Sequence, residues 1–189
     1  MIKTIFFDRD GVLNDLVEGA DGKLRAPYNL TELKINYQAR DLINQTKNSF
    51  NFALFTNQPD IGNRKLKQLD FDKILHEISS VYSEISDFLV CPHAQELLCS
   101  CRKPSPQMLI EYAAVRNCNL ENSWVIGDRW IDIAAGHSAG CSTILLEKWY
   151  SWDATSDGSE PLSSLQPTIS VLNFSELKKY QRQIEQVNR

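Results

Sequence analysis

Two acidic residues near the start of the chain have the types and spacing to do chemistry. Asp8 and Asp10 follow directly on the apolar run at positions 3–7, and Gly11 comes next. Ligands in α/β proteins bind at the carboxyl ends of strands, and a glycine lets the backbone turn there. We therefore expect both carboxylates to reach one site, where they could act as nucleophile and proton carrier and bind Mg²⁺.

Three other apolar runs also lead into polar residues. They are 52–55, which precedes Thr56, Asn57 and Gln58; 88–91, whose following segment ends at Arg102 and Lys103; and 124–126, which precedes Gly127 and Asp128. The carboxyl ends of parallel strands emerge at one edge of a sheet. We therefore expect these polar residues to converge on the acidic pair.

The converging groups suit phosphoryl transfer, which depends on positioning and on neutralising negative charge. Asp8 and Asp128, with a backbone carbonyl near Asp10, offer oxygen ligands for Mg²⁺. The Thr56 hydroxyl and the Lys103 ammonium group can surround the phosphate oxygens. We place Asn57 with these phosphate- or substrate-binding groups, and Arg102 can add a bidentate contact.

A second constellation lies between positions 91 and 101. It contains Cys91, His93, Cys99 and Cys101, and Arg102 and Lys103 follow directly. Three thiols and one imidazole supply the four ligands of a closed tetrahedral zinc site, which leaves no open position for water. We therefore expect a structural Zn²⁺ that fixes the loop carrying the two basic residues.

Composition narrows the class of protein. The 189 residues are 42% hydrophobic and 23% charged, with a net charge of −4 and no basic block, so nucleic acid is not an expected partner. No apolar run approaches membrane-spanning length, and the first residues resemble a strand more than a signal peptide. We expect a cytoplasmic monomer without membrane contact. Cys118 and Cys141 stand apart from the cluster and are predicted to be buried fillers.

Strand-like and helix-like stretches alternate along the chain. The expected strands are 3–7, 52–55, 88–91, 124–126, 143–146 and, more weakly, 169–172; the expected helices are 71–85, 106–115, 130–139 and one that starts near 175. This alternation predicts a three-layer, Rossmann-like α/β fold, with a mainly parallel sheet and helices on both faces. We expect one domain over 1–189, without a large cap domain.

The ordered polar segments resemble the four motifs of haloacid-dehalogenase-type phosphatases. The resemblance implies that Asp8 is a nucleophile that forms an aspartyl-phosphate and that Asp10 is the general acid and base. It also implies that Thr56 and Lys103 stabilise the phosphate and that Asp128 binds Mg²⁺ together with Asp8 and Asp10. Asp132 is then expected to support the ligands and not to bind the metal itself.

The cysteine loop resembles the branch of this family that contains heptose 1,7-bisphosphate 7-phosphatases and histidinol-phosphate phosphatases. The resemblance implies a small phosphorylated sugar as substrate, with the heptose 7-phosphate preferred and histidinol phosphate as the alternative. A nucleic-acid 3′-phosphatase and an inactive binding module are further alternatives. Without a cap, substrate contacts are expected from 14–19, 59–64 and Arg102. Three aromatic residues after the strand at 143–146 are expected mainly to cover the core, with packing over the edge of the site as the alternative: Trp149, Tyr150 and Trp152.

Overall fold

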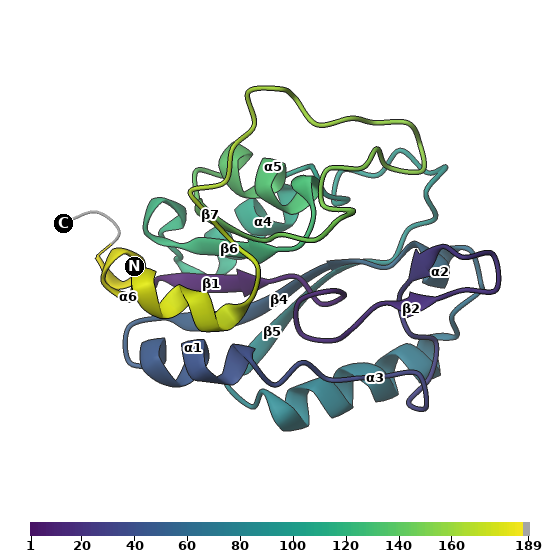
Figure 1. The fold of residues 1–189 in the computed structure, drawn as a ribbon, viewed down its shortest axis with the longest axis horizontal. Helices are drawn as coiled ribbons and strands as arrows, with labels where there is room; N and C mark the ends of the chain where they lie inside the picture. The colour runs from purple at the N-terminus through teal and green to yellow at the C-terminus, as the bar shows by residue number, and fades with distance from the viewer. Residues whose placement is uncertain (187–189) are drawn as a thin grey trace.

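The centre of the fold is a six-stranded sheet in which all neighbouring strands pair in parallel (Figure 1). The structure is a computed structural model that describes residues 1–186. In the order β5-β4-β1-β6-β7-β8, the strands are Ile85–Cys91, Asn51–Asn57, Thr4–Phe7, Trp124–Gly127, Ser142–Leu146 and Ile169–Val171. After β1, the chain adds β4 and β5 on one side of β1 and then adds β6, β7 and β8 on the other side. The carboxyl ends beside β1 are therefore a topological switch point, where ligands bind in such sheets.

Helices cover both faces of the sheet and enclose two separate cores. One core is formed with α1 (Ala39–Thr46), α3 (Gln68–Val81), the 3₁₀ helix η2 (Phe174–Tyr180) and α6 (Gln181–Glu185); the other is formed with α4 (Gln107–Arg116) and α5 (Trp130–Ser138). Side chains alternate across a strand, so Ile5 and Phe7 enter the first core and Phe6 enters the second. This arrangement confirms the predicted three-layer α/β fold.

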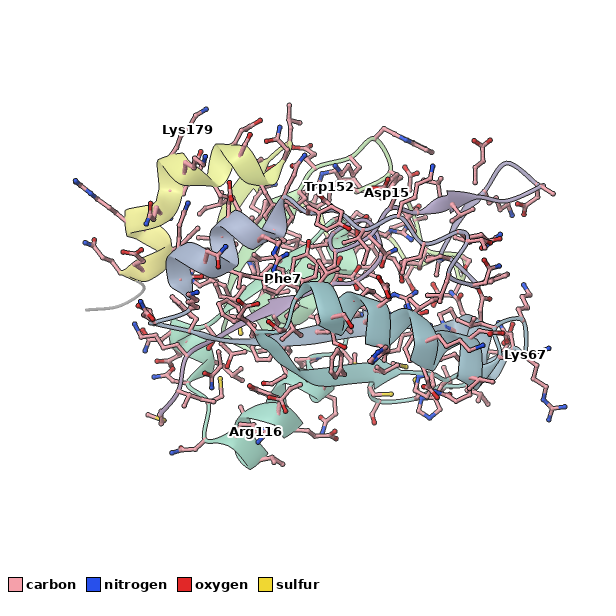
Figure 2. All side chains as sticks on the ribbon, turned by 90° about the horizontal axis from the view of Figure 1, so that it is seen from below. Phe7, Asp15, Lys67, Arg116, Trp152 and Lys179 are labelled. Carbon is pink, nitrogen blue, oxygen red and sulfur yellow. The ribbon has the colours of Figure 1, made fainter. Side chains whose placement is uncertain are left out.

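Figure 2 shows the interior Phe7 against exposed residues at the periphery, among them Lys67, Arg116 and Lys179. Cys118 and Cys141 are buried, as predicted for filler residues. Within residues 1–186, no helix is both long enough and apolar enough to cross a bilayer.

The connections at the carboxyl edge of the sheet are small. A hairpin of β2 (Val17–Glu18) and β3 (Leu24–Arg25) follows β1, and the one-turn helix α2 (Pro59–Gly62) follows β4. At the opposite, amino edge of the sheet, the 3₁₀ turn η1 (Leu120–Asn122) precedes β6. The hairpin and α2 lie at the end of the molecule opposite the N-terminus (Figure 1).

Two predicted helices differ from the observed ones. The predicted helix at 71–85 instead ends at Val81, and Ile85 begins β5 by pairing with Phe52. The expected helix from position 175 is a 3₁₀ helix that becomes α-helical only at Gln181. At Ile85, apolar spacing alone could not reveal that a neighbouring strand would offer a pairing partner. The hairpin, α1, α2 and η1 had no counterpart in the prediction.

Candidate active site

Three buried carboxylates and one lysine meet at the carboxyl ends of β1 and β6. Asp8 follows β1, Asp128 follows β6, and Asp132 lies in the first turn of α5. One oxygen from each carboxylate lies within 4.8 Å of the others. Lys103 is also buried, and its Nζ lies 2.6 Å from Asp8 Oδ1 and 2.6 Å from Asp132 Oδ1. The predicted convergence of Asp8, Lys103 and Asp128 is therefore present in the structure.

Burial makes this cluster electrostatically unusual. It raises the pKa of Asp8 to about 7; Lys103 opposes the shift, whereas Asp132 and Asp10 add to it. Burial, together with the charges of Asp8 and Asp132, also raises the pKa of Asp128. Burial disfavours the charged form of Lys103, but Asp132 and Asp8 outweigh it and raise the lysine pKa. One ammonium group thus pairs with two of three buried carboxylates.

Two glycines allow the carboxylates to approach the backbone so closely. Gly11 has φ +86°, a left-handed conformation that suits glycine, and a Cβ there would collide with the Asp128 carboxylate. A Cβ on Gly127 would collide with the side chain of Asp132. The glycine in each motif is therefore needed to bring β1 and β6 into one site.

Asp132 is fully engaged by the protein. Its Oδ2 accepts a hydrogen bond of 3.0 Å from the Arg129 backbone N–H at the start of α5, while its Oδ1 pairs with Lys103. These contacts fix the lysine and the first turn of the helix at the same time. They agree with the expectation that Asp132 supports the ligands of the site.

Asp10 is held by three neighbouring side chains. Its carboxylate accepts hydrogen bonds from Arg9 at 2.8 Å, Asn14 at 3.0 Å and Gln58 at 2.7 Å. Arg9 is completely buried, and its guanidinium carbon lies 5.3 Å from the ring centroid of Phe71 in α3. Gln58 is expected near the site as part of the polar segment after 52–55, but the sequence does not predict that Gln58 and Arg9 orient the general acid.

The polar residues at the end of β4 have separate partners. Thr56 is buried, and its hydroxyl accepts a hydrogen bond of 2.9 Å from Gln58 Nε2, which links it to Asp10. The Asn57 amide forms two hydrogen bonds with the Lys103 backbone, donating to the carbonyl oxygen at 3.2 Å and accepting from the N–H at 3.0 Å. Asn57 thus positions Lys103 in the structure, and its substrate contact stays a prediction.

Tyr150 also belongs to this site. Its hydroxyl donates a hydrogen bond of 2.6 Å to Asp128 Oδ2. Burial, together with the Asp128 carboxylate, raises the tyrosine pKa, so the hydroxyl stays protonated at neutral pH. The favoured expectation, that Tyr150 mainly covers the core, is therefore wrong, because its hydroxyl lies at the site. Its neighbour Trp149 is 82% exposed and packs edge-on against the Tyr150 ring.

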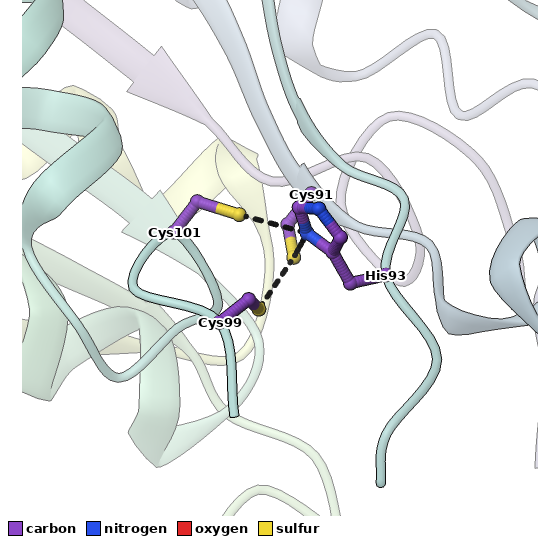
Figure 3. A group of neighbouring side chains, drawn as sticks. All are labelled: Cys91, His93, Cys99 and Cys101. Carbon is purple, nitrogen blue, oxygen red and sulfur yellow. Dashed lines mark hydrogen bonds between the residues drawn. The ribbon is translucent and has the colours of Figure 1, made fainter. Parts of the chain in front are cut away.

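The cysteine and histidine side chains converge after β5 (Figure 3). Cys91 Sγ lies 3.6 Å from both His93 Nδ1 and Cys99 Sγ, and His93 Nδ1 lies 3.2 Å from Cys101 Sγ. A tetrahedral zinc would separate two sulfur ligands by about 3.8 Å and a sulfur and a nitrogen by about 3.6 Å. All four ligand atoms lie within 4.8 Å of one another, so this group fits a zinc ion.

The loop that carries this cluster contacts two other segments. The Arg102 guanidinium donates to the His93 carbonyl oxygen, which places Arg102 against the loop. On one side, Gly62 of α2 packs so closely that a Cβ would lie 2.7 Å from the Pro92 carbonyl oxygen. On the other side, Ser156 donates a hydrogen bond of 2.6 Å to Gln95. The Arg102 contact with substrate stays a prediction.

The carboxylate cluster fits a hard divalent cation. Its donors are oxygens, the group is buried, and one lysine leaves negative charge uncompensated. Asp8 and Asp128 would hold the ion, since both oxygens of Asp132 are already engaged. The predicted contribution of Asp10, through its backbone carbonyl, stays a prediction.

Comparisons with known proteins agree with this geometry. A family model described as HAD-hydrolase-like matches residues 100–148, which include Lys103, Asp128 and Asp132. Among curated proteins, the histidine biosynthesis bifunctional protein HisB of Campylobacter jejuni (strain 81-176) is 32% identical over 73% of this chain. The corresponding protein of Actinobacillus pleuropneumoniae is 29% identical over 75%. The chain aligns with only 40% and 39% of these two relatives.

Solved structures share the fold over nearly the whole chain. A D,D-heptose 1,7-bisphosphate phosphatase from B. bronchiseptica, complexed with magnesium and phosphate, matches with a TM-score of 0.75 and 22% identity, covering 96% of this chain and 99% of the other. An HAD-superfamily hydrolase from Geobacter sulfurreducens matches with a TM-score of 0.60 and 14% identity, covering 95% and 99%. At these identities the likeness establishes the fold.

Proposed function

We propose that this chain, which the sequence and fold matches support as a haloacid-dehalogenase-type phosphatase, is a Mg²⁺-dependent phosphomonoesterase acting on a small phosphorylated sugar. The observation that carries the proposal is the buried cluster in which Lys103 bridges Asp8 and Asp132, with Asp128 beside them. A phosphate monoester needs both a nucleophile and positive charge. Asp8 offers the nucleophile and Lys103 offers one positive charge, and the Mg²⁺ that Asp8 and Asp128 would hold supplies more.

In the proposed reaction, an Asp8 carboxylate oxygen attacks the phosphorus atom and forms a P–O bond. The bond from phosphorus to the leaving alcohol breaks, and Asp10 gives its proton to that alcohol oxygen. Asp10 then removes a proton from water, whose oxygen attacks the aspartyl-phosphate, and inorganic phosphate leaves with Asp8 regenerated. Lys103 and the Thr56 hydroxyl hold the phosphate oxygens through both steps.

A bound Mg²⁺ would neutralise phosphate charge and favour ionised Asp8. Without it, the raised pKa of Asp8, about 7, leaves a large part of the nucleophile protonated at neutral pH. Lys103, at 2.6 Å, favours the ionised form as well. The hydrogen bonds from Arg9, Asn14 and Gln58 hold the Asp10 carboxylate in one orientation.

For the substrate, we propose the 7-phosphate of a heptose 1,7-bisphosphate. The fold match to a heptose bisphosphate phosphatase over nearly the full chain supports this choice. Histidinol phosphate is the second candidate, because the curated relatives are bifunctional proteins of histidine biosynthesis. A monomer in a reducing, cytoplasmic setting remains part of the proposal, and the five unpaired thiols fit such a setting.

Phosphate release from a defined panel tests the proposal. The panel contains heptose 1,7-bisphosphate, histidinol phosphate and a 3′-phosphorylated oligonucleotide, each with and without Mg²⁺. We expect the highest kcat/KM on the heptose bisphosphate, with loss of its 7-phosphate in the ³¹P spectrum. Asp8→Asn is the control for a contaminating phosphatase and should release no phosphate.

The other outcomes identify which part of the proposal is wrong. A higher kcat/KM on histidinol phosphate would replace the substrate and keep the reaction. Activity confined to the oligonucleotide would overturn the sugar class. Absence of turnover on every substrate in the panel would favour an inactive binding module of the same fold.

A further inference from the structure

Residues 148–151, in the segment after β7, contact Asp128 through two hydrogen bonds. The Tyr150 hydroxyl donates to Asp128 Oδ2 at 2.6 Å, and the Ser151 hydroxyl donates to the Asp128 backbone oxygen at 2.5 Å. Ser151 Oγ in turn accepts a hydrogen bond of 2.8 Å from the Lys148 N–H, and its carbonyl oxygen accepts one of 2.9 Å from Trp130 N–H. The segment therefore holds both the backbone and the side chain of Asp128.

The space around the Tyr150 hydroxyl is closely fitted. A Cβ at Gly11 would lie 3.0 Å from the tyrosine oxygen as well as colliding with Asp128. The hydroxyl thus lies where the β1 turn meets the end of β6, inside the carboxylate site. The Tyr150 ring is itself held edge-on by Trp149, with ring centroids 5.4 Å apart and an angle of 84°.

We propose that Tyr150 is a positioning residue that fixes the Asp128 carboxylate for binding Mg²⁺. The hydrogen bond occupies Oδ2, and the hydrogen bonds of residues 1–186 leave Oδ1 of Asp128 available. This inference rests on the proposed function, because it assumes that Asp128 is a ligand of the metal. Tyr150 itself does not touch the phosphate in this account.

The physical effect is orientation of a metal ligand. A carboxylate that rotates freely about its last bond must be ordered when the ion binds, and a hydrogen-bonded one is already ordered. Groups that orient metal ligands in this way typically change metal affinity by about 10- to 100-fold when they are removed. A single hydroxyl on one of several ligands should lie near the lower end of that range.

The chain offers a matched control. The Tyr28 hydroxyl donates a hydrogen bond of 2.8 Å to Asp60, so it is a second tyrosine–aspartate pair, and neither residue belongs to the carboxylate cluster. Tyr28→Phe and Tyr150→Phe each remove one hydroxyl from such a pair and keep the ring. Only Tyr150→Phe should change the affinity of the carboxylate cluster for Mg²⁺.

Isothermal titration of zinc-loaded, magnesium-free protein with MgCl₂ tests the inference. We expect the Kd for Mg²⁺ to rise about 10-fold in Tyr150→Phe and to stay within twofold of wild type in Tyr28→Phe. In activity assays of Tyr150→Phe, the Mg²⁺ concentration that gives half the maximal rate should rise by a similar factor. The rate at saturating Mg²⁺ should fall by less than this factor. Circular dichroism of each variant checks that the fold is retained.

The opposite results separate this inference from the proposed function. A wild-type protein that binds Mg²⁺ while Tyr150→Phe binds it equally well or more tightly overturns the role of Tyr150 alone. A wild-type protein that binds no Mg²⁺ overturns both. If Tyr150→Phe is unfolded, Ser151→Ala provides the second variant, because it loosens the same segment; an unchanged Kd there also counts against the inference.

Discussion

At the scale of single residues, the site concentrates negative charge that the fold compensates only in part. Asp8, Asp128 and Asp132 are all buried, and Lys103 pairs with two of them. Buried carboxylates in such a group resist ionisation, as the raised pKa values of Asp8 and Asp128 show. We therefore expect that removing one of these carboxylate charges makes the metal-free protein more stable at neutral pH.

Asp8→Asn should stabilise the metal-free protein, and the gain should depend on pH. The folded-state pKa of Asp8 is about 7, against 3.8 as its ordinary value. Between these values the folded protein holds a proton that the unfolded chain lacks, so its stability falls as pH rises. The variant escapes this penalty, and its advantage should grow from pH 5 to pH 7 and then level off, reaching on the order of a few kcal/mol. Urea unfolding at several pH values measures it.

Glu32→Gln is a control at a carboxylate whose pKa is lowered, whereas the pKa of Asp8 is raised. The hydrogen bond from Arg25 lowers the pKa of Glu32 to about 2, from the ordinary 4.5. A lowered pKa contributes stability that is present above about pH 4.5 and is lost only as pH falls towards 2. Glu32→Gln should therefore reduce stability by a constant amount between pH 5 and pH 8. An Asp8→Asn advantage that is equally constant would contradict the electrostatic account.

Asp10→Asn should slow turnover by about 10²- to 10⁴-fold, because proton transfer to the leaving oxygen is lost. The loss should be smaller on an activated aryl phosphate, whose leaving group needs little protonation. Comparing kcat/KM on the aryl phosphate and on the sugar phosphate measures this difference. Equal losses on both substrates would count against Asp10 as the acid.

Sequence reasoning found the site residues that directly follow strands. Asp8, Thr56 and Asp128 could be located because each follows an apolar run. The hydrogen bonds of Gln58 and Tyr150 could not be predicted, because their partners lie far away in the chain and neither residue type has a distinctive pattern. A tyrosine after a strand is more often part of the surface cover, and only the fold shows its hydroxyl against Asp128.

At the scale of elements, the helix α2 joins two loops at the open edge of the sheet. Tyr28, in the segment after the hairpin, donates to Asp60 of α2. On the opposite side, Gly62 of α2 packs against the backbone of the loop that carries the cysteine and histidine cluster, near Pro92 and His93. The segment 59–64, predicted as a substrate loop, thus also contacts the loop of the candidate zinc ligands.

Gly62→Ala should weaken the zinc site. The added Cβ would lie 2.7 Å from the Pro92 carbonyl oxygen and 2.8 Å from the His93 carbonyl carbon, so this backbone must move. We expect a loss of about 1–3 kcal/mol in the free energy of unfolding, as for other overpacked contacts, and faster release of zinc to a chelator. Asn63→Ala, at the next position, should release zinc at the wild-type rate. Equal release rates for the Gly62 variant and wild type would contradict the packing argument.

The sequence predicted the strands of the central sheet well and their connections less well. Strands β1, β4, β6 and β7 could be found because each is a short apolar run. The boundary between α3 and β5 could not, because Ile85 continues the helical spacing and only pairing with Phe52 assigns it to a strand. The hairpin and α2 are mostly polar and owe their conformation to contacts such as Tyr28 with Asp60.

At the scale of the whole molecule, two candidate metal sites with different donors lie at the carboxyl edge of one sheet. The thiol and imidazole cluster follows β5, and Lys103 connects its loop to the carboxylate cluster after β1 and β6. Soft donors favour zinc and oxygen donors favour magnesium. Each metal should therefore have its own role, one in structure and the other in turnover.

The purified protein should hold about one tightly bound zinc per chain, and Cys99→Ser should retain less. Stripping the zinc should lower Tm by about 5 °C or more, since 1 kcal/mol corresponds to about 2–4 °C for a chain of this size. Turnover should fall when zinc is removed, because the loop that carries Lys103 loosens. Added Zn²⁺ should not replace Mg²⁺ in the assay. Wild-type protein without zinc, or zinc loss that leaves both Tm and turnover unchanged, would contradict a structural zinc site.

The central claim is that Asp8 accepts the phosphoryl group of a monoester substrate. Its most direct test is acid quenching during turnover with Mg²⁺, followed by mass spectrometry of the peptide that contains Asp8. We expect this peptide to gain the mass of one phosphoryl group in wild type and not in Asp8→Asn, which should also release no phosphate. Phosphate release by Asp8→Asn at the wild-type rate, or a phosphoryl group trapped on another residue, would contradict it.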